Sequence, residues 1–133
     1  MEELQIAATI ENLNAVNAFA EEQLDTLACP MRASMQLMVA LEELYVNVAH
    51  YAYGDAAGDV TVQIGVEDGM LLIRLIDQGT PFDPLAMADP DVTLSAEDRP
   101  IGGLGVYMVK KSMDLFTYEY ANGSNIVTIG KKL

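Results

Sequence analysis

The sequence predicts an α/β fold, a two-layer sandwich in which a mostly antiparallel sheet is backed by helices. Two stretches of alternating apolar residues predict β-hairpins, one over 60–77 around Asp68-Gly69 and one over 116–131 around Asn122-Gly123. Before and between them, apolar residues recur with helical spacing. The chain has 133 residues, enough for one core and too few for two large ones, so we expect a single domain over residues 1–133.

The part of the chain before the first hairpin predicts one short strand and two helices. Loose alternation over 4–10 indicates the strand, and a helix over about 12–27 follows, capped by an asparagine at its start. Pro30 separates this helix from a long one over about 31–53, because proline is tolerated in the first turn of a helix and disfavoured inside it. The long helix is apolar nearly all round, so we expect it to be buried.

The turn at Asp68-Gly69 sets the register of the first hairpin. Counting back from it pairs Val66 with Leu71, and the pairing runs on to Val60 opposite Asp77. These pairs share one face of the ribbon because side chains alternate along a strand. Asp77 is therefore predicted on the core face at a strand end, where an apolar residue is expected.

The stretch over 78–99 has no regular period and is rich in glycine, proline and aspartate. A loop of this length in a small domain is usually functional or disordered. Gly102-Gly103-Leu104-Gly105 then opens an amphipathic helix that we expect to run to about Leu115.

Charge and composition limit the classes of partner. Twenty acidic residues against seven basic ones give a formal charge of -13, which favours basic partners and opposes direct binding of nucleic acid. The apolar runs are too short for a membrane span, and the first residues lack the pattern of a signal peptide. The single cysteine, Cys29, cannot form an internal disulfide. We therefore expect a cytoplasmic protein without membrane association.

Three polar features interrupt the apolar pattern. Glu43 and Asn47 lie one turn apart on one stripe of the long helix, where burying an unpaired charge is costly. Asp77 with Gly79 two residues later is the second feature, and the glycines at 102–105 are the third. Each has a structural explanation of its own: a carboxylate in an ion pair, a turn after a strand, and a flexible start to a helix.

Together, the three features resemble the GHKL ATPase superfamily, which includes the ATP-binding domains of gyrase, histidine kinases and mismatch-repair proteins. The match is closest to the bacterial anti-sigma factor serine/threonine kinase branch, the RsbW type. The matching motifs are Glu43-x-x-x-Asn47, Asp77-Gln78-Gly79-Thr80-Pro81-Phe82-Asp83-Pro84, Gly102-Gly103-Leu104-Gly105 and the closing stretch over 122–131. The resemblance implies a Bergerat-type ATP-binding fold over almost the whole chain.

The resemblance also implies a role for each motif residue. Asn47 would ligate Mg²⁺, which prefers oxygen ligands. Glu43 would be the catalytic base that accepts the proton of an attacking hydroxyl. Asp77 would accept a hydrogen bond from the adenine amino group, and Gly79 would let the base approach the backbone closely.

Further residues are implied at the phosphates and near the base. Gly103 and Gly105 would present backbone amides and a helix N-terminus to the phosphates of ATP or ADP. Arg99, in the expected lid over 85–101, is a candidate phosphate contact, although an exposed loop arginine explains it equally well. Thr128 is a candidate for a hydrogen bond near the adenine, although a strand threonine needs no such role.

The implied function is a partner switch. An ATP-dependent anti-sigma factor of this type would bind a sigma factor in one state and phosphorylate a serine or threonine of a STAS-domain antagonist in another; relatives commonly form homodimers. One alternative is a nucleotide-sensing module of the same fold that regulates a partner without phosphorylating it. Others are a detached histidine-kinase catalytic domain and a fold that binds no nucleotide. The intact Asn47, Asp77 and Gly105 argue against the last.

Overall fold

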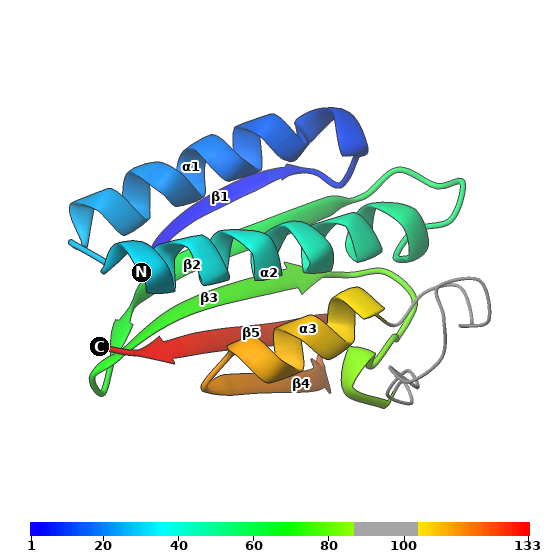
Figure 1. Cartoon of the computed structure of the whole chain (residues 1–133). Helices are drawn as coiled ribbons and strands as arrows, with labels where there is room; N and C mark the ends of the chain where they lie inside the picture. The colour runs from blue at the N-terminus through cyan, green and yellow to red at the C-terminus, as the bar shows by residue number, and fades with distance from the viewer. Residues whose placement is uncertain (87–103) are drawn as a thin grey trace.

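Five antiparallel strands form one sheet in the order β1-β2-β3-β5-β4, and three helices cover one face of it (Figure 1). This computed structural model describes residues 1–86 and 104–133. The strands are β1 (Glu2–Ala7), β2 (Asp59–Glu67), β3 (Met70–Asp77), β4 (Leu115–Ala121) and β5 (Ser124–Lys132). The helices are α1 (Leu13–Thr26), α2 (Met31–Tyr51) and α3 (Leu104–Ser112), with 3-10 turns at η1 (Ile10–Asn12) and η2 (Pro84–Ala86). The predicted α/β sandwich is confirmed.

Both hairpins form where the sequence predicts them. Asp68, Gly69, Asn122 and Gly123 all have positive φ angles, between 52° and 79°, as the two-residue turns of β-hairpins require. The register of β2 against β3 is the predicted one, with Val60 opposite Asp77.

Two predicted boundaries are wrong. The first strand is Glu2–Ala7, because the chain turns through η1 before α1 begins. Helix α3 ends at Ser112, three residues before the predicted end, because Leu115 already pairs with Gly130 in the sheet. Backbone groups that form hydrogen bonds in the sheet are not available for the hydrogen bonds of a helix.

Helix α2 is buried on one side only. Leu37, Leu41 and Tyr45 face the sheet and are inaccessible to solvent, whereas Met35 and Val39 are exposed on the outer side. The expectation that this helix is buried all round is therefore wrong. The helices form a single layer, so the outer side of α2 has neighbouring helices beside it but no layer above it (Figure 1).

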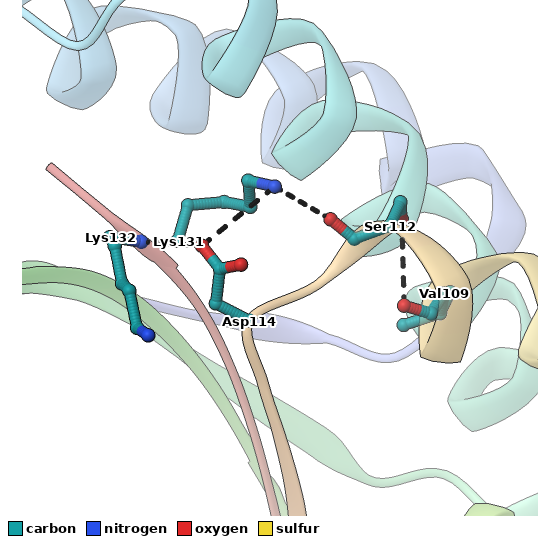
Figure 2. A network of polar contacts seen from close by, with 5 residues as sticks. All are labelled: Val109, Ser112, Asp114, Lys131 and Lys132. Carbon is teal, nitrogen blue, oxygen red and sulfur yellow. Dashed lines mark hydrogen bonds and ion pairs between the residues drawn. The ribbon is translucent and has the colours of Figure 1, made fainter.

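A small polar network ties the end of α3 to β5 (Figure 2). The ammonium of Lys131 donates a hydrogen bond to the carbonyl oxygen of Ser112 at 2.8 Å and lies 3.8 Å from the carboxylate of Asp114. The amide of Lys132 donates to the same carboxylate at 2.7 Å. A cation at the C-terminus of a helix is favourable because the helix dipole is negative there. This network fixes the position of α3 relative to the sheet.

The face of the sheet opposite the helices carries polar side chains. There, the guanidinium of Arg74 donates hydrogen bonds to Thr128 Oγ1 and to Gln63 Oε1, both at 3.4 Å. Within the part of the chain that the structure describes, no helix is long and apolar enough to cross a membrane.

Candidate functional site

Asp77 ends β3 on the helix side of the sheet and is only 4% exposed. Its Oδ1 accepts hydrogen bonds from the backbone amide of Gly79 and from the side chain of Asn125, both at 2.9 Å. Within the described residues, no donor is bonded to Oδ2. This oxygen is therefore free to accept a hydrogen bond from a ligand in the cavity that Asp77 lines.

Asn125, which sequence reasoning missed, organises the loop that follows β3. It lies opposite Asp77 in β5 and is also 4% exposed. Its Nδ2 donates to the carbonyl oxygen of Thr80 at 3.0 Å, and its Oδ1 accepts from the amide of Phe82 at 3.2 Å and from the hydroxyl of Tyr118. Burial raises the pKa of Tyr118, so its hydroxyl stays protonated as a donor. Asn125 thus holds Asp77 and the loop in one arrangement.

A signal for Asn125 was present in the sequence. Residues alternate along the last strand, and the side chains of Val127 and Ile129 are buried among the core residues. Asn125 shares their face, so it is a polar residue where an apolar one is expected. The same signal drew attention to Asp77.

Gly79 packs directly on the end of α2. A Cβ at this position would overlap the carbonyl oxygen of Ala52, so no side chain fits there. The same carbonyl oxygen accepts a hydrogen bond from the amide of Thr80 at 2.7 Å. The amide of Gln78, the residue before Gly79, donates a hydrogen bond to the hydroxyl of Tyr53 at 2.9 Å. The loop after β3 is therefore bound to the two residues that follow α2 as well as to β5.

These elements enclose a cavity of about 30 Å³ between α2, the ends of β3 and β5, and the loop. Apolar side chains line most of it, and its polar lining residues include Asn47, Asp77 and Asn125. The rings of Tyr51 and Phe82 lie 6.4 Å apart at its edge, and both are exposed. This volume suits about one or two water molecules.

Asn47 and Glu43 continue the site along α2. Asn47 lines the cavity, and its side-chain amide has no hydrogen-bond partner within the described residues. One turn earlier, Glu43 is exposed rather than buried and lies against the first turn of α3. A Cβ on Gly105 would overlap the Glu43 carboxylate. The structure thus brings Glu43, Asn47, Gly105, Asp77 and Gly79 to one end of the helix layer.

Three predicted residues do not join this group. Thr128 points to the opposite face of the sheet, where it accepts a hydrogen bond from Arg74, because alternation along β5 separates it from Val127 on the cavity side. The expectation that Thr128 reaches the adenine is therefore wrong. Arg99 and Gly103 lie outside the described residues, so their expected contacts with phosphate stay predictions.

The described residues hold no cluster of three histidine, cysteine, aspartate or glutamate side chains that could bind a metal ion. A hard ion such as Mg²⁺ is commonly held by only one or two protein oxygens together with water and phosphate oxygens of a substrate. The Asn47 side chain fits such a site because its oxygen has no hydrogen-bond partner among the described residues. Any ion here would depend on the ligand for most of its coordination.

Comparison with known proteins decides the family. Residues 6–131 match the family model described as histidine kinase-like ATPase domain. The chain belongs to this family. Among curated relatives, it is 31% identical over 96 residues to the serine-protein kinase RsbW of Listeria monocytogenes, an alignment that covers 68% of this chain and 61% of the relative. It is 25% identical over 95 residues to the protein of the same name from Bacillus cereus, with coverage of 68% and 59%.

A solved structure shares the fold of this chain. The crystal structure of the RsbU and RsbW domains of Rv1364c from Mycobacterium tuberculosis matches 100% of this chain and 33% of that one, with a TM-score of 0.65 and 17% identity. The aligned part of the chain spans about 60% of the length of the curated relatives.

Membership in the histidine kinase-like ATPase family implies that the chain binds ATP, and the described residues fit this ligand. Among the described residues, Asp77 Oδ2 has no donor, and Gly79 lacks a side chain where a Cβ would overlap the carbonyl oxygen of Ala52. Asn47 has a free amide further along α2. The curated relatives carry the name serine-protein kinase.

Proposed function

We propose that this chain is an ATP-dependent serine/threonine kinase that acts as an anti-sigma factor in the cytoplasm. It would bind a sigma factor in one state and, in another, phosphorylate a serine or threonine of a STAS-domain antagonist. The observation that carries this proposal is the arrangement of Asp77, Asn47 and Glu43. Asp77, at the end of β3, lines the same cavity as Asn47 of α2, and Glu43 lies one turn earlier on that helix. The relatives named RsbW support the choice of partners.

Asp77 would select adenine over guanine in the nucleotide. Its Oδ2 accepts a hydrogen bond from the amino group of adenine, and a hydrogen bond to a charged acceptor contributes about 1.5–3 kcal/mol when buried. Guanine carries a carbonyl oxygen at the corresponding position, which would face the carboxylate without a proton between them. The site therefore favours ATP over GTP.

Asn47 and Gly105 hold the phosphate end. The first turn of α3 offers backbone amides and the positive end of a helix dipole, and both favour an anion. Asn47 would supply one oxygen to a Mg²⁺ ion shared with the phosphates, which neutralises part of their charge when bound. In a chain with a formal charge of -13, this neutralisation is needed for a polyanion to bind.

Glu43 would accept the proton of the attacking hydroxyl. It is an exposed carboxylate beside Gly105, so a group from another protein can reach it without rearrangement of the core. General base catalysis of this kind contributes about 10²–10⁴-fold to a rate. The neighbouring Glu42 is also exposed but points about 100° away around the helix.

The test compares Glu43→Gln with the matched control Glu42→Gln. With radiolabelled ATP and the STAS-domain proteins of the same genome, we expect transfer by Glu43→Gln to fall at least about 100-fold. Its affinity for a fluorescent ATP analogue should stay within about twofold of the wild type, because the residue does not line the cavity around Asp77. Undiminished transfer by Glu43→Gln would remove it as the base. Nucleotide binding without transfer by the wild type would favour a nucleotide-sensing module.

A further inference from the structure

A groove of about 340 Å³ runs between α2 and α3 on the outer side of the helix layer. The two helices lie side by side and run in opposite directions (Figure 1). Met35 and Ser112 lie at one end of the groove, and Glu43 and Gly105 lie at the other. The groove therefore leads to the carboxylate that we propose as the base.

The walls of the groove are apolar and exposed. Met35, Val39 and Met108 are 63%, 54% and 55% exposed, and all three line it. Single exposed apolar residues are ordinary, but three around one groove indicate a binding surface. Two of them are methionines, whose flexible side chains adapt to the shape of a partner.

The charge of the groove also suits a protein partner. Glu43 is the only charged side chain that lines it among the described residues, although the whole chain has a formal charge of -13. A neutral segment can therefore enter without burying several unpaired charges of the groove. Apolar contacts supply the affinity for such a segment.

The position of the groove indicates what occupies it. Asn47 and the cavity beside Asp77 lie beyond Glu43 along α2, so the nucleotide approaches Glu43 from that side. Phosphoryl transfer requires the attacking and leaving oxygens to lie roughly in line with the phosphorus. The hydroxyl must then arrive from the other side, which is the side of the groove.

We propose that the groove between α2 and α3 docks an apolar segment of the substrate protein next to its acceptor serine or threonine. This proposal rests on the proposed kinase function. The acceptor oxygen forms a bond to the γ-phosphorus while the bond from that phosphorus to the bridging oxygen of ADP breaks and its electron pair leaves with ADP. Glu43 takes the hydroxyl proton. Met35, Val39 and Met108 determine which segments bind.

The test uses a double variant, Met35→Gln with Met108→Gln, and the matched control Met31→Gln. Glutamine has nearly the length and helix propensity of methionine, so the helices are kept. Met31 is exposed on α2 but does not line the groove. The probe is a STAS-domain protein of the same genome, titrated with the chain in the presence of a non-hydrolysable ATP analogue and then used as the substrate for transfer.

We expect the double variant to bind the STAS-domain protein about tenfold more weakly, a difference of about 1.4 kcal/mol. Its KM for this protein should rise by the same factor, with kcat and the KM for ATP unchanged, and Met31→Gln should match the wild type. Equal affinity and KM in the double variant would overturn the proposal. So would a loss of self-association in light scattering with binding of the STAS-domain protein retained, because the groove would then belong to a second copy of the chain.

The kinase function can fail separately from the groove. If the wild type binds the STAS-domain protein but transfers no phosphate, the proposed activity is refuted while the binding comparison still tests the groove. If the wild type neither binds nor phosphorylates any STAS-domain protein, both proposals are refuted.

Discussion

Replacing Asn125 with alanine should both destabilise the fold and weaken nucleotide binding. The side chain is buried and bonds Asp77, Thr80, Phe82 and Tyr118. A buried polar group that loses its partner costs about 1–3 kcal/mol. Thr80 and Phe82 are exposed enough for water to replace their bonds, whereas Asp77 is not. We therefore expect a loss of about 3 kcal/mol in the free energy of unfolding, rather than the sum over four partners.

This loss corresponds to a decrease in melting temperature on the order of 10 °C for a domain of this size. Nucleotide affinity should fall at least about tenfold, because the loop and the Asp77 carboxylate lose their fixed positions. Thermal unfolding measures the first effect, and titration with a fluorescent ATP analogue below the melting temperature measures the second.

The matched control for this variant is Thr128→Val. Thr128 lies on the same strand as Asn125 and is also buried, but it faces the other side of the sheet. Valine keeps its shape and removes only a hydrogen bond of 3.4 Å from Arg74. We expect nucleotide affinity to stay within about twofold of the wild type. An affinity loss in Thr128→Val, or an Asn125→Ala chain that binds ATP normally, would refute the role of Asn125 as the support of the site.

Three further variants test separate parts of the structure. Gly79→Ala forces a Cβ into the carbonyl oxygen of Ala52, so calorimetry should show a loss of about 3 kcal/mol and titration a loss of nucleotide binding. Asn47→Ala should weaken ATP binding about tenfold in the presence of Mg²⁺ and hardly at all in excess chelator; equal effects in both would remove Asn47 as a ligand. Burial raises the pKa of Tyr45 above 10.0, so its stabilising effect is complete below about pH 10 and is lost as pH rises through the folded pKa. Melting temperatures measured across this range should fall less steeply above about pH 10 in Tyr45→Phe than in the wild type.

Local signals in the sequence were enough to predict the fold class. The turns at Asp68-Gly69 and Asn122-Gly123 specify hairpins from adjacent residues, and the first turn also fixes the register that places Asp77 on the core face. The position of β5 between β3 and β4 depends on pairing between distant segments, which adjacent residues do not encode. The exposed side of α2 was also not predictable, because Met35 and Val39 look like core residues until the neighbouring elements are placed.

The candidate site was predicted in part for the same reason. Glu43 and Asn47 share a helix face, and Asp77 and Gly79 share a turn, so their spacing within each motif is visible in the sequence. The contact between the motifs is not. Asn125 was missed because its bond to Asp77 joins residues 48 positions apart. Thr128 was chosen from the resemblance alone, and strand alternation turns it away from the cavity.

The two ends of the site differ in burial, and this difference bears on how transfer is controlled. The end at Asp77 is buried and held by Asn125 on one side and by the residue that follows α2 on the other. Glu43, at the other end, is exposed to water. Electrostatic interactions strengthen when water is excluded, and water near a reacting phosphate also competes with the acceptor hydroxyl.

A partner that fills the groove between α2 and α3 would cover Glu43 and exclude that water. The same contact that delivers the hydroxyl would thus complete the surroundings of the base. In the proposed kinase, nucleotide binding would then not need the partner, whereas phosphoryl transfer would. Such a chain would retain ATP without hydrolysing it rapidly, and the apolar walls of the proposed groove would determine which protein starts the reaction.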